Sequence, residues 1–479
     1  MDRKIIKNYL YSTVVQAITL IVPFITIPYI SRILTAEEMG LFHYTLNVMT
    51  YFSLAAELGF QFYGQKVIVN SKDEKEEREN FLKILYLKLI FGSAILLIYI
   101  LIVVIFLENK LLYFCQAFSI LGVIFDITWY FAGKEDFKRV AIRGLFFKLA
   151  SVVLLFTIVR GEHALIKYIL SLQIPNFIGN LLMYYKLDIK FTKVHFEFQD
   201  VKATMISAFV LLIPSMLTSL YQIIDKAMLG NLSSMTEVGY YSQMLKLTGI
   251  FSIVVYSIGK VIFPRLIAHY HKNEISEVQK LMSEIVSFVV HLGFPICVGV
   301  YCILDLFVPW FYGDKYLILI DYFPYALPLI IVSSLNHIFS SQLLIAINKE
   351  KLLYLLISIN IIINISLDFL LIPHFDAIGA IIASVISESI QFICSVVVYK
   401  KYVGGKILEA NNAKVLVACL GMAALLLLLK QTLQFGAIVE TIITVIVGAG
   451  SYFIILKLLK DSVAEKIVNI AFRKIKNKG

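Results

Sequence analysis

The chain has 479 residues, of which 59% are hydrophobic and only 16% are charged, and its mean hydropathy is +0.83. Soluble globular proteins carry roughly 25% charged residues. A chain with so little charge cannot cover a water-facing surface, which excludes a soluble, disordered or fibrous protein. The net charge is +10, from 43 basic and 33 acidic residues, and its placement matters more than its sum.

Fourteen apolar segments follow one another along the chain. A helix needs ~20 mostly apolar residues to cross the hydrocarbon core of a bilayer, and all but one of these segments approach or exceed that length. They predict an all-α polytopic membrane protein. The predicted spans are 8–30, 40–62, 81–107, 111–132, 142–159, 165–185, 203–224, 238–263, 281–304, 322–347, 352–372, 377–399, 415–429 and 435–456.

Basic residues are distributed unevenly between the two sides of these spans. If the N-terminus lies in the cytoplasm, 31 of the 43 Lys and Arg residues fall on the cytoplasmic side, six in outer loops and six deeper within spans; the 31 include Arg143, at the start of the span 142–159. Because Lys and Arg resist translocation, we expect a multi-pass protein of the bacterial cytoplasmic membrane with both termini in the cytoplasm. The basic tail at 466–479 is then expected to contact lipid headgroups, not nucleic acid.

Two pairs of short matches indicate an internal duplication. EEMGLF at 37–42 resembles TEVGYY at 236–241, a shift of 199 residues, and GKEDF at 133–137 resembles NKEKL at 348–352, a shift of 215. The matches lie in corresponding loops of two sets of six spans. Each set has an even number of spans, so we expect parallel repeats of the kind found in transporters whose halves rock around a central site.

The duplication predicts three parts of the chain. An N-lobe of helices 1–6 occupies 1–200, and a C-lobe of helices 7–12 occupies 201–401. Helices 13 and 14 and the basic cytoplasmic tail occupy 402–479.

Polar residues gather on one face of several predicted spans. In the second span, His43, Asn47, Thr50, Glu57 and Gln61 recur at helical spacing. A charge at the bilayer centre costs ~2.5–3.5 kcal/mol or more, so we interpret these faces as the wall of a water-filled cavity. Hydrogen bonding between helices is the alternative interpretation. The expected cavity residues are Asn47, Glu57, Lys88, Asp126, Lys148, Asp225, Lys246 and Glu388; for Lys88 and Lys148, snorkelling to the membrane surface is a second alternative.

Sequence motifs of common enzymes are missing. The chain has no G-x-x-x-x-G-K-[ST], no H-E-x-x-H and no G-x-S-x-G, the signatures of nucleotide hydrolysis, metallopeptidases and serine hydrolases. It has no C-x-x-C pair for a metal. We therefore expect a transporter, not an enzyme, with no cofactor or metal and with H⁺, Na⁺ or the membrane potential as the candidate driving force.

Several segments resemble the bacterial polysaccharide-unit flippases of the multidrug/oligosaccharidyl-lipid/polysaccharide exporter superfamily. The most telling patterns are W-x-x-x-G-x-E, formed by Trp129, Gly133 and Glu135, and D-K-x-x-L-G, which begins at Asp225. Thr35 stands where the family commonly has glycine. The resembling segments are SRILTAEEMGLF at 31–42, ELGFQFYG at 57–64, ITWYFAGKEDF at 127–137 and DKAMLGNLSSMTEVGYYSQMLKL at 225–247.

This resemblance implies a V-shaped, two-lobed fold similar to that of multidrug-and-toxin exporters. It implies that the substrate is an undecaprenyl-diphosphate-linked oligosaccharide repeat unit, moved from the inner to the outer leaflet by alternating access. The product would supply lipopolysaccharide, capsule or exopolysaccharide synthesis, with membrane lipids, a polysaccharide polymerase and glycosyltransferases as partners. The cationic cavity of the family maps onto Arg32, Lys88, Lys148 and Lys246.

Two other functions remain open at this point. An ion-coupled exporter of drugs or organic cations would want acidic residues in its cavity, and Glu57, Asp126 and Asp225 could serve. A lipid scramblase, or a scaffold for a glycan-assembly complex, is the second alternative.

Overall fold

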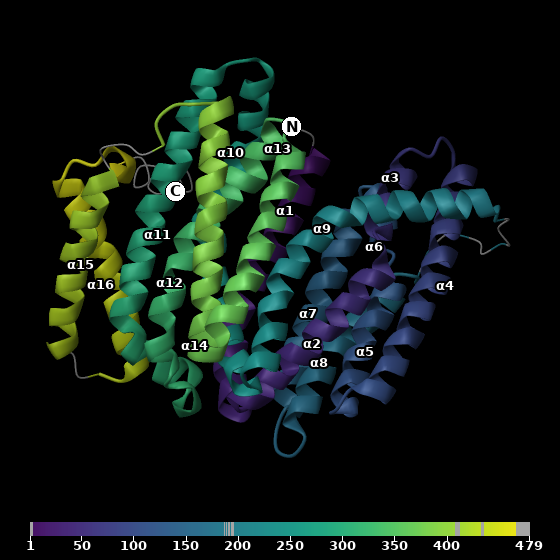
Figure 1. Ribbon diagram of the computed structural model, residues 1–479, viewed down its shortest axis with the longest axis horizontal. Helices are drawn as coiled ribbons and strands as arrows, with labels where there is room; N and C mark the ends of the chain where they lie inside the picture. Colours follow the sequence, from purple (N-terminus) through teal and green to yellow (C-terminus); the bar gives the residue numbers. More distant parts are fainter. Residues whose placement is uncertain are drawn as a thin grey trace. The chain divides into compact units, whose positions relative to one another are not determined.

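The computed structural model describes residues 3–185, 187, 189, 192, 196–407, 412–432 and 435–465; the basic tail at 466–479 lies outside them. Within these residues the secondary structure is helical, and no strand occurs. The chain divides into two compact units, Met1–Gly230 and Asn231–Gly479. Figure 1 shows the helices of each unit in the colours of the sequence.

Unit 1 is built from nine α-helices among its described residues. They are α1 Arg3–Ile33, α2 Ala36–Glu57, α3 Phe60–Val69, α4 Glu74–Phe106, α5 Lys110–Ile124, α6 Thr128–Gly133, α7 Phe137–Ile158, α8 Ala164–Leu182 and α9 Phe198–Leu232.

The described part of unit 2 begins with α10 Met235–His271 and α11 Ile275–Tyr312, followed by a 3-10 turn, η1, at Asp314–Tyr316. Next come α12 Leu319–Asn336, a π-helix, η2, at His337–Leu343, α13 Leu344–Ala346, α14 Glu350–Tyr402, α15 Asn412–Thr432 and α16 Ala437–Leu458.

The fourteen predicted spans all coincide with helices. The long helix α14 accounts for two of them, because Asp376 has non-helical angles (φ 50°, ψ −131°) and breaks the helix between the predicted spans 352–372 and 377–399. Among the described residues, nine helices are long and apolar enough to cross a membrane. The prediction of an all-α polytopic membrane protein is therefore confirmed.

Three spans that the sequence predicts as continuous are interrupted. The span 40–62 breaks at Leu58 and Gly59, which both have positive φ (45° and 81°). A Cβ on Gly59 would lie 2.1 Å from the carbonyl oxygen of Ala208, so glycine allows the backbones of α9 and α2–α3 to approach closely. The span 111–132 breaks between α5 and α6, and the span 322–347 contains the π-helix η2.

The ends of corresponding helices support the internal repeat. Thr35 caps the N-terminus of α2 by accepting a bond from the backbone N–H of Glu38, and Ser234 caps α10 by accepting one from that of Glu237. Both Ser and Thr are preferred at this position because the side-chain oxygen satisfies a free backbone donor. The two caps are 199 residues apart, which is the shift that the sequence match predicts.

The second match needs a small correction. Glu135 and Asn348 share φ of 56° and close the preceding helices in the same way, through bonds from Asp136 N to Phe131 O (2.8 Å) and from Lys349 N to Leu344 O (2.7 Å). These turns are 213 residues apart, whereas the match of GKEDF with NKEKL gives 215. The sequence match aligned the glutamates, but backbone geometry fixes the turn two residues earlier in the second copy.

The seventh helix, α9, packs within unit 1, although the repeat places it at the start of the second copy. Asn47 of α2 donates to the carbonyl of Ile223 (3.3 Å), and Tyr63 and Thr204 share a hydroxyl bond of 3.4 Å. The start of α9 runs across the end of the unit near α3 and α4 before the helix turns along the bundle (Figure 1). The lobe boundary at 200/201 stays a prediction based on the repeat.

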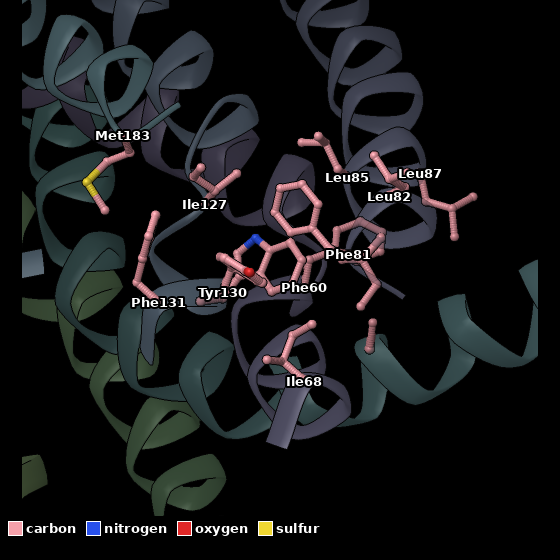
Figure 2. Close-up of a cluster of buried hydrophobic side chains, with 13 residues drawn as sticks. Phe60, Ile68, Phe81, Leu82, Leu85, Leu87, Ile127, Tyr130, Phe131 and Met183 are labelled. Atoms are coloured by element: carbon pink, nitrogen blue, oxygen red, sulfur yellow. The ribbon is translucent and has the colours of Figure 1, made fainter. Parts of the chain in front are cut away.

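One core of unit 1 surrounds Trp129, a residue of the W-x-x-x-G-x-E pattern. The indole ring is fully buried and stacks on Phe81 with centroids 5.5 Å apart. A Cβ at Gly64 would lie 2.4 Å from this ring, and one at Gly133 would lie 2.9 Å from Ile68. Figure 2 shows how side chains from α3, α4 and α6 converge here. The pattern therefore marks a packing site that anchors α6 and the start of α7.

In unit 2, α15 and α16 pack against α11 through buried polar contacts. Trp310 Nε1 donates to Thr441 Oγ1 (2.8 Å), and the hydroxyl of Tyr452 donates to the carbonyl of His291 (2.9 Å). The ring of His291 also meets Asp461 Oδ1 at 3.2 Å, and neither side chain is more than 1% exposed. These bonds attach α16 to the unit, and Ser287 Oγ of α11 donates to Asn412 Oδ1 at the start of α15 (2.9 Å).

Candidate functional site

Three of the predicted cavity residues meet inside unit 1. Lys88 of α4 is 1% exposed, and its Nζ donates to the backbone carbonyl of Asp126 (2.9 Å). The ammonium also interacts electrostatically with the carboxylates of Glu57 and Asp126. A buried cation must be paired and hydrogen-bonded, and these two acids supply the pairing. Lys88 is thus an interior charge of the unit, and contact with a substrate stays a prediction.

The break between α5 and α6 positions Asp126. Its Oδ1 accepts a bond from the backbone N–H of Thr128 (2.7 Å), so the carboxylate satisfies a donor at the start of α6. Gln61, in α3, donates to the hydroxyl of Thr128 (3.2 Å). The same break frees the carbonyl of Asp126 to receive Lys88, so a local backbone feature brings α3, α4 and α6 together around one charge cluster.

Arg143 of α7 extends this cluster, and the sequence analysis did not select it. Its Nη2 donates to Asn176 Oδ1 at 3.0 Å and also to Asn180 Oδ1, both in α8. Asn180 is fixed in turn by a bond from its Nδ2 to the carbonyl of Gly122 (2.7 Å). The guanidinium interacts electrostatically with Asp126, while its buried Nε has no hydrogen-bond acceptor. Arg143 is therefore a cation held firmly by α8.

A pocket of about 250 Å³ opens beside Arg143. Its lining residues come from α7 and α8, and none of them is acidic. Lys148 lies five residues further along α7, and its Nζ donates to the hydroxyl of Thr19 in α1 (2.9 Å). A Cβ at Gly144 would meet no atom within 4 Å, so this side of α7 has space. The lining residues are Arg143, Gly144, Phe147, Lys148, Ser151 and Asn176.

The pocket lies on the side of α7 that points away from lipid. Ile142, Phe146, Leu149 and Val153 recur at helical spacing and are between 50% and 63% exposed, which is the pattern of a lipid-facing stripe. At 100° per residue, the pocket residues of α7 centre on the opposite face of the helix. Two cations, a hydroxyl and an amide thus converge on an inward-facing hollow without a carboxylate in its lining, and this composition suits an anionic group.

A second, larger pocket of about 830 Å³ lies at the end of unit 1 where α7 begins. It is formed by the start of α4, by α6 and by the turn into α7. Unlike the first pocket, it contains both signs of charge, and Glu77 accepts bonds from Lys134 Nζ (2.8 Å) and from the hydroxyl of Tyr130 (2.7 Å). Its lining residues are Glu74, Lys75, Glu77, Arg78, Tyr130, Phe131, Lys134, Asp136, Arg139, Leu187 and Ile189.

Other predicted residues of unit 1 lie outside this group. Asn47 is buried and bonded to α9, and Asp225 of α9 is 4% exposed. Arg32, at the end of α1, is exposed and donates to the carbonyl of Pro28. For Asn47 and Gln61 the structure shows hydrogen bonding between helices, the alternative stated above. Thr218 and Gln222 precede Asp225 at helical spacing in the seventh predicted span, and their side chains lie outside the described residues.

Two predicted residues belong to unit 2. Lys246 is half-buried on α10, one turn before Gly249, where a Cβ would meet no atom within 4 Å. Glu388 is half-buried on α14, and its carbonyl accepts a bond from Asn336 Nδ2 (2.7 Å). On α14, Asn360, Asn364 and Asp368 recur four residues apart and are buried. The roles of Lys246 and Glu388 as cavity residues stay predictions.

Comparisons with known proteins agree with this architecture. A family model described as "Polysaccharide biosynthesis protein" matches residues 5–268, more than half of the chain. A putative O-antigen transporter of Shigella dysenteriae is 22% identical over 80% of this chain and 96% of its own length. The capsular polysaccharide biosynthesis protein CapF of Staphylococcus aureus is 24% identical over 83% of this chain and 99% of its own length.

Solved structures extend the similarity to the fold. The lipid II flippase MurJ in an inward closed conformation has a TM-score of 0.73 at 13% identity, and the match covers 94% of this chain and 98% of MurJ. An inward-facing multidrug resistance transporter of the MATE family has a TM-score of 0.59 at 10% identity, covering 80% and 98% of the two chains. At such low identity these matches establish the fold alone.

Proposed function

The chain belongs to the polysaccharide biosynthesis protein family, and from this premise we propose that it moves lipid-linked saccharides across a membrane. Specifically, we propose that the substrate is an undecaprenyl-diphosphate-linked oligosaccharide repeat unit. The protein carries it from the inner to the outer leaflet of the bacterial cytoplasmic membrane, with both of its own termini in the cytoplasm. The relatives named as an O-antigen transporter and a capsular polysaccharide biosynthesis protein support this assignment.

The pocket beside Arg143 is the observation that carries the proposal. It offers Arg143 and Lys148 on the inward face of α7, held by Asn176, Asn180 and Thr19. Guanidinium and ammonium groups bind phosphate oxygens through charge-assisted hydrogen bonds. An exporter of organic cations would need carboxylates at this place, and none lines the pocket.

The physics of the substrate explains why such a pocket is needed. A diphosphate and its sugars cannot enter hydrocarbon unaided, because their charges and hydroxyls would lose water without replacement bonds. A polar hollow between helices accepts the head group, while the lipid tail stays in the bilayer. With an inside-negative potential, outward movement of the anion is favoured by ~2.3 kcal/mol per charge per 100 mV. The potential, or a gradient of H⁺ or Na⁺, then biases an alternating-access cycle.

Reconstitution tests the proposal. Proteoliposomes with a fluorescent undecaprenyl-diphosphate oligosaccharide should show protein-dependent movement between leaflets that responds to an imposed potential. We expect Lys148→Gln and Arg143→Lys to slow this movement at least about tenfold, since each removes a charge-assisted contact. The control is Lys138→Gln, an exposed residue of α7 that lines neither pocket, and it should leave the rate unchanged.

Three outcomes would count against the proposal. Movement that ignores the potential and accepts any lipid would indicate a scramblase. Uptake of organic cations without movement of the lipid-linked saccharide would indicate a drug exporter. Normal rates in both pocket variants would show that the head group binds elsewhere.

A further inference from the structure

The larger pocket of unit 1 has no place in the proposed binding of the diphosphate. At about 830 Å³ it is within the 300–1,000 Å³ typical of small-molecule sites. It is formed by segments far apart in sequence, at Glu74–Arg78, Tyr130–Asp136 and Arg139. Trp129 and its buried neighbours brace α6 against α3 and α4, so one wall of the pocket rests on a packed core (Figure 2).

Four of the seven charged residues that line this pocket form two ion pairs with one another. Glu77 holds Lys134 and Tyr130, and Asp136 pairs with Arg139 at 3.0 Å. The bond to Glu77 raises the pKa of Lys134 above its usual value. A free anion prefers a site without carboxylates in its lining, which describes the small pocket and not this one. The large pocket instead presents fixed donors and acceptors side by side.

A saccharide matches that arrangement. Each hydroxyl of a sugar both donates and accepts hydrogen bonds, so a wall of paired acids and bases can satisfy it without an excess of either charge. The rings of Tyr130 and Phe131 supply apolar surface next to these groups, which suits the C–H faces of a sugar ring. The ligand that fits best is therefore a neutral or weakly charged polyhydroxyl group.

The two pockets are neighbours along α7. Arg139 lines the large pocket and Arg143 the small one, and residues four apart lie on one face of a helix with ~6 Å of rise between them. In a lipid-linked oligosaccharide the first sugar is bonded directly to the diphosphate. A head group with its diphosphate at Arg143 and Lys148 would thus place its sugars at Arg139, toward the end of the unit.

We propose that the large pocket binds the saccharide part of the substrate while the small pocket holds its diphosphate. This inference rests on the proposed function. From the start of α7 inward, the sugar site comes first and the diphosphate site second, which is the order of these groups in a substrate that enters from the inner leaflet. The pocket is therefore a loading site for the glycan, and it makes recognition depend on what the diphosphate carries.

The test compares two substrates in the reconstituted full-length protein, undecaprenyl diphosphate without sugar and undecaprenyl diphosphate with the complete oligosaccharide. We expect Glu77→Gln and Arg139→Gln to raise the half-saturating concentration of the oligosaccharide substrate about tenfold, since each removes a charged partner. The sugar-free substrate should change less than about twofold. Lys138→Gln, beside the pocket, should change neither, and free oligosaccharide should inhibit the wild-type protein.

Four results distinguish a failure of this inference from a failure of the proposed function. If the wild-type protein moves neither substrate, the proposed function itself fails. If it moves both substrates, and the variants lower the affinity for both equally or for neither, the large pocket does not bind the glycan. If purified variants behave normally but cells carrying them make less polymer, the pocket docks a protein partner instead. A loss of folded protein in Arg139→Gln leaves Glu77→Gln to decide, because it keeps the shape of the side chain.

Discussion

Replacing Lys88 with methionine tests the buried charge cluster of unit 1. Lys88 is 1% exposed, bonds to the carbonyl of Asp126 and faces the carboxylates of Glu57 and Asp126. Methionine fills a similar volume but leaves two partly buried carboxylates without their cation. Removal of one partner from a buried ion pair costs about 3–5 kcal/mol. For a unit of this size each kcal/mol corresponds to about 2–4 °C in Tm, so a decrease on the order of 10 °C is expected.

Thermal unfolding of the purified protein in detergent measures this decrease in Tm. Two further variants serve as an exposed control and as a compensating change. Lys83→Met removes a cation from the same helix, but the pair of Lys83 with Asp200 is 3.6 Å long and exposed to solvent. Such pairs contribute about 0–1 kcal/mol, so Tm should hardly move. Adding Glu57→Gln to Lys88→Met should recover part of the loss, because one uncompensated charge disappears. Equal Tm values for the two lysine variants would refute the reasoning.

Two further predictions concern packing and the attachment of the last helices. Gly64→Ala places a methyl group 2.4 Å from the Trp129 ring and should lower the free energy of unfolding by about 1–3 kcal/mol through overpacking. Gly144→Ala is the neutral control in the same melting assay, because a Cβ at Gly144 meets no atom within 4 Å. Asp461→Ala leaves the buried ring of His291 and two backbone N–H groups without their acceptor. It should lower the free energy of unfolding by about 3 kcal/mol and make the segment after α15 more sensitive to protease. Protease sensitivity equal to that of the wild-type protein would contradict this.

The helices were predictable from the sequence because their signal is local. The length of each apolar run and the charges around it identify fourteen spans, and short motifs identify the repeat. The interruptions were not predictable, because they depend on other helices. Gly59 breaks a span where the carbonyl of Ala208 approaches it. At the α5–α6 break, the carbonyl of Asp126 accepts a hydrogen bond from Lys88, which belongs to another helix, α4.

In the candidate site, too, some residues could be predicted from local sequence and one could not. Lys148, Glu57 and Asp126 stand out because each is a charge inside an apolar run, whereas Arg143 was counted among the cytoplasmic basic residues. Its helix begins earlier than the hydropathy indicates, because Asp136 caps α7 through the backbone N–H of Arg139 (3.3 Å). Asp is a common N-cap residue, and this signal could have moved the helix start. Arg143 would then have fallen in the second turn of the helix that also carries Lys148.

Direct binding of a prenyl diphosphate tests the central claim, that Arg143 and Lys148 form the site of the anionic head group. The purified protein in detergent is titrated with a short-chain prenyl diphosphate and with the prenyl alcohol of the same length. The account predicts that the diphosphate binds far more tightly than the alcohol, and that Lys148→Gln weakens this binding at least about tenfold while Lys138→Gln does not. Equal affinity for the two ligands, or unchanged binding in Lys148→Gln, would contradict it.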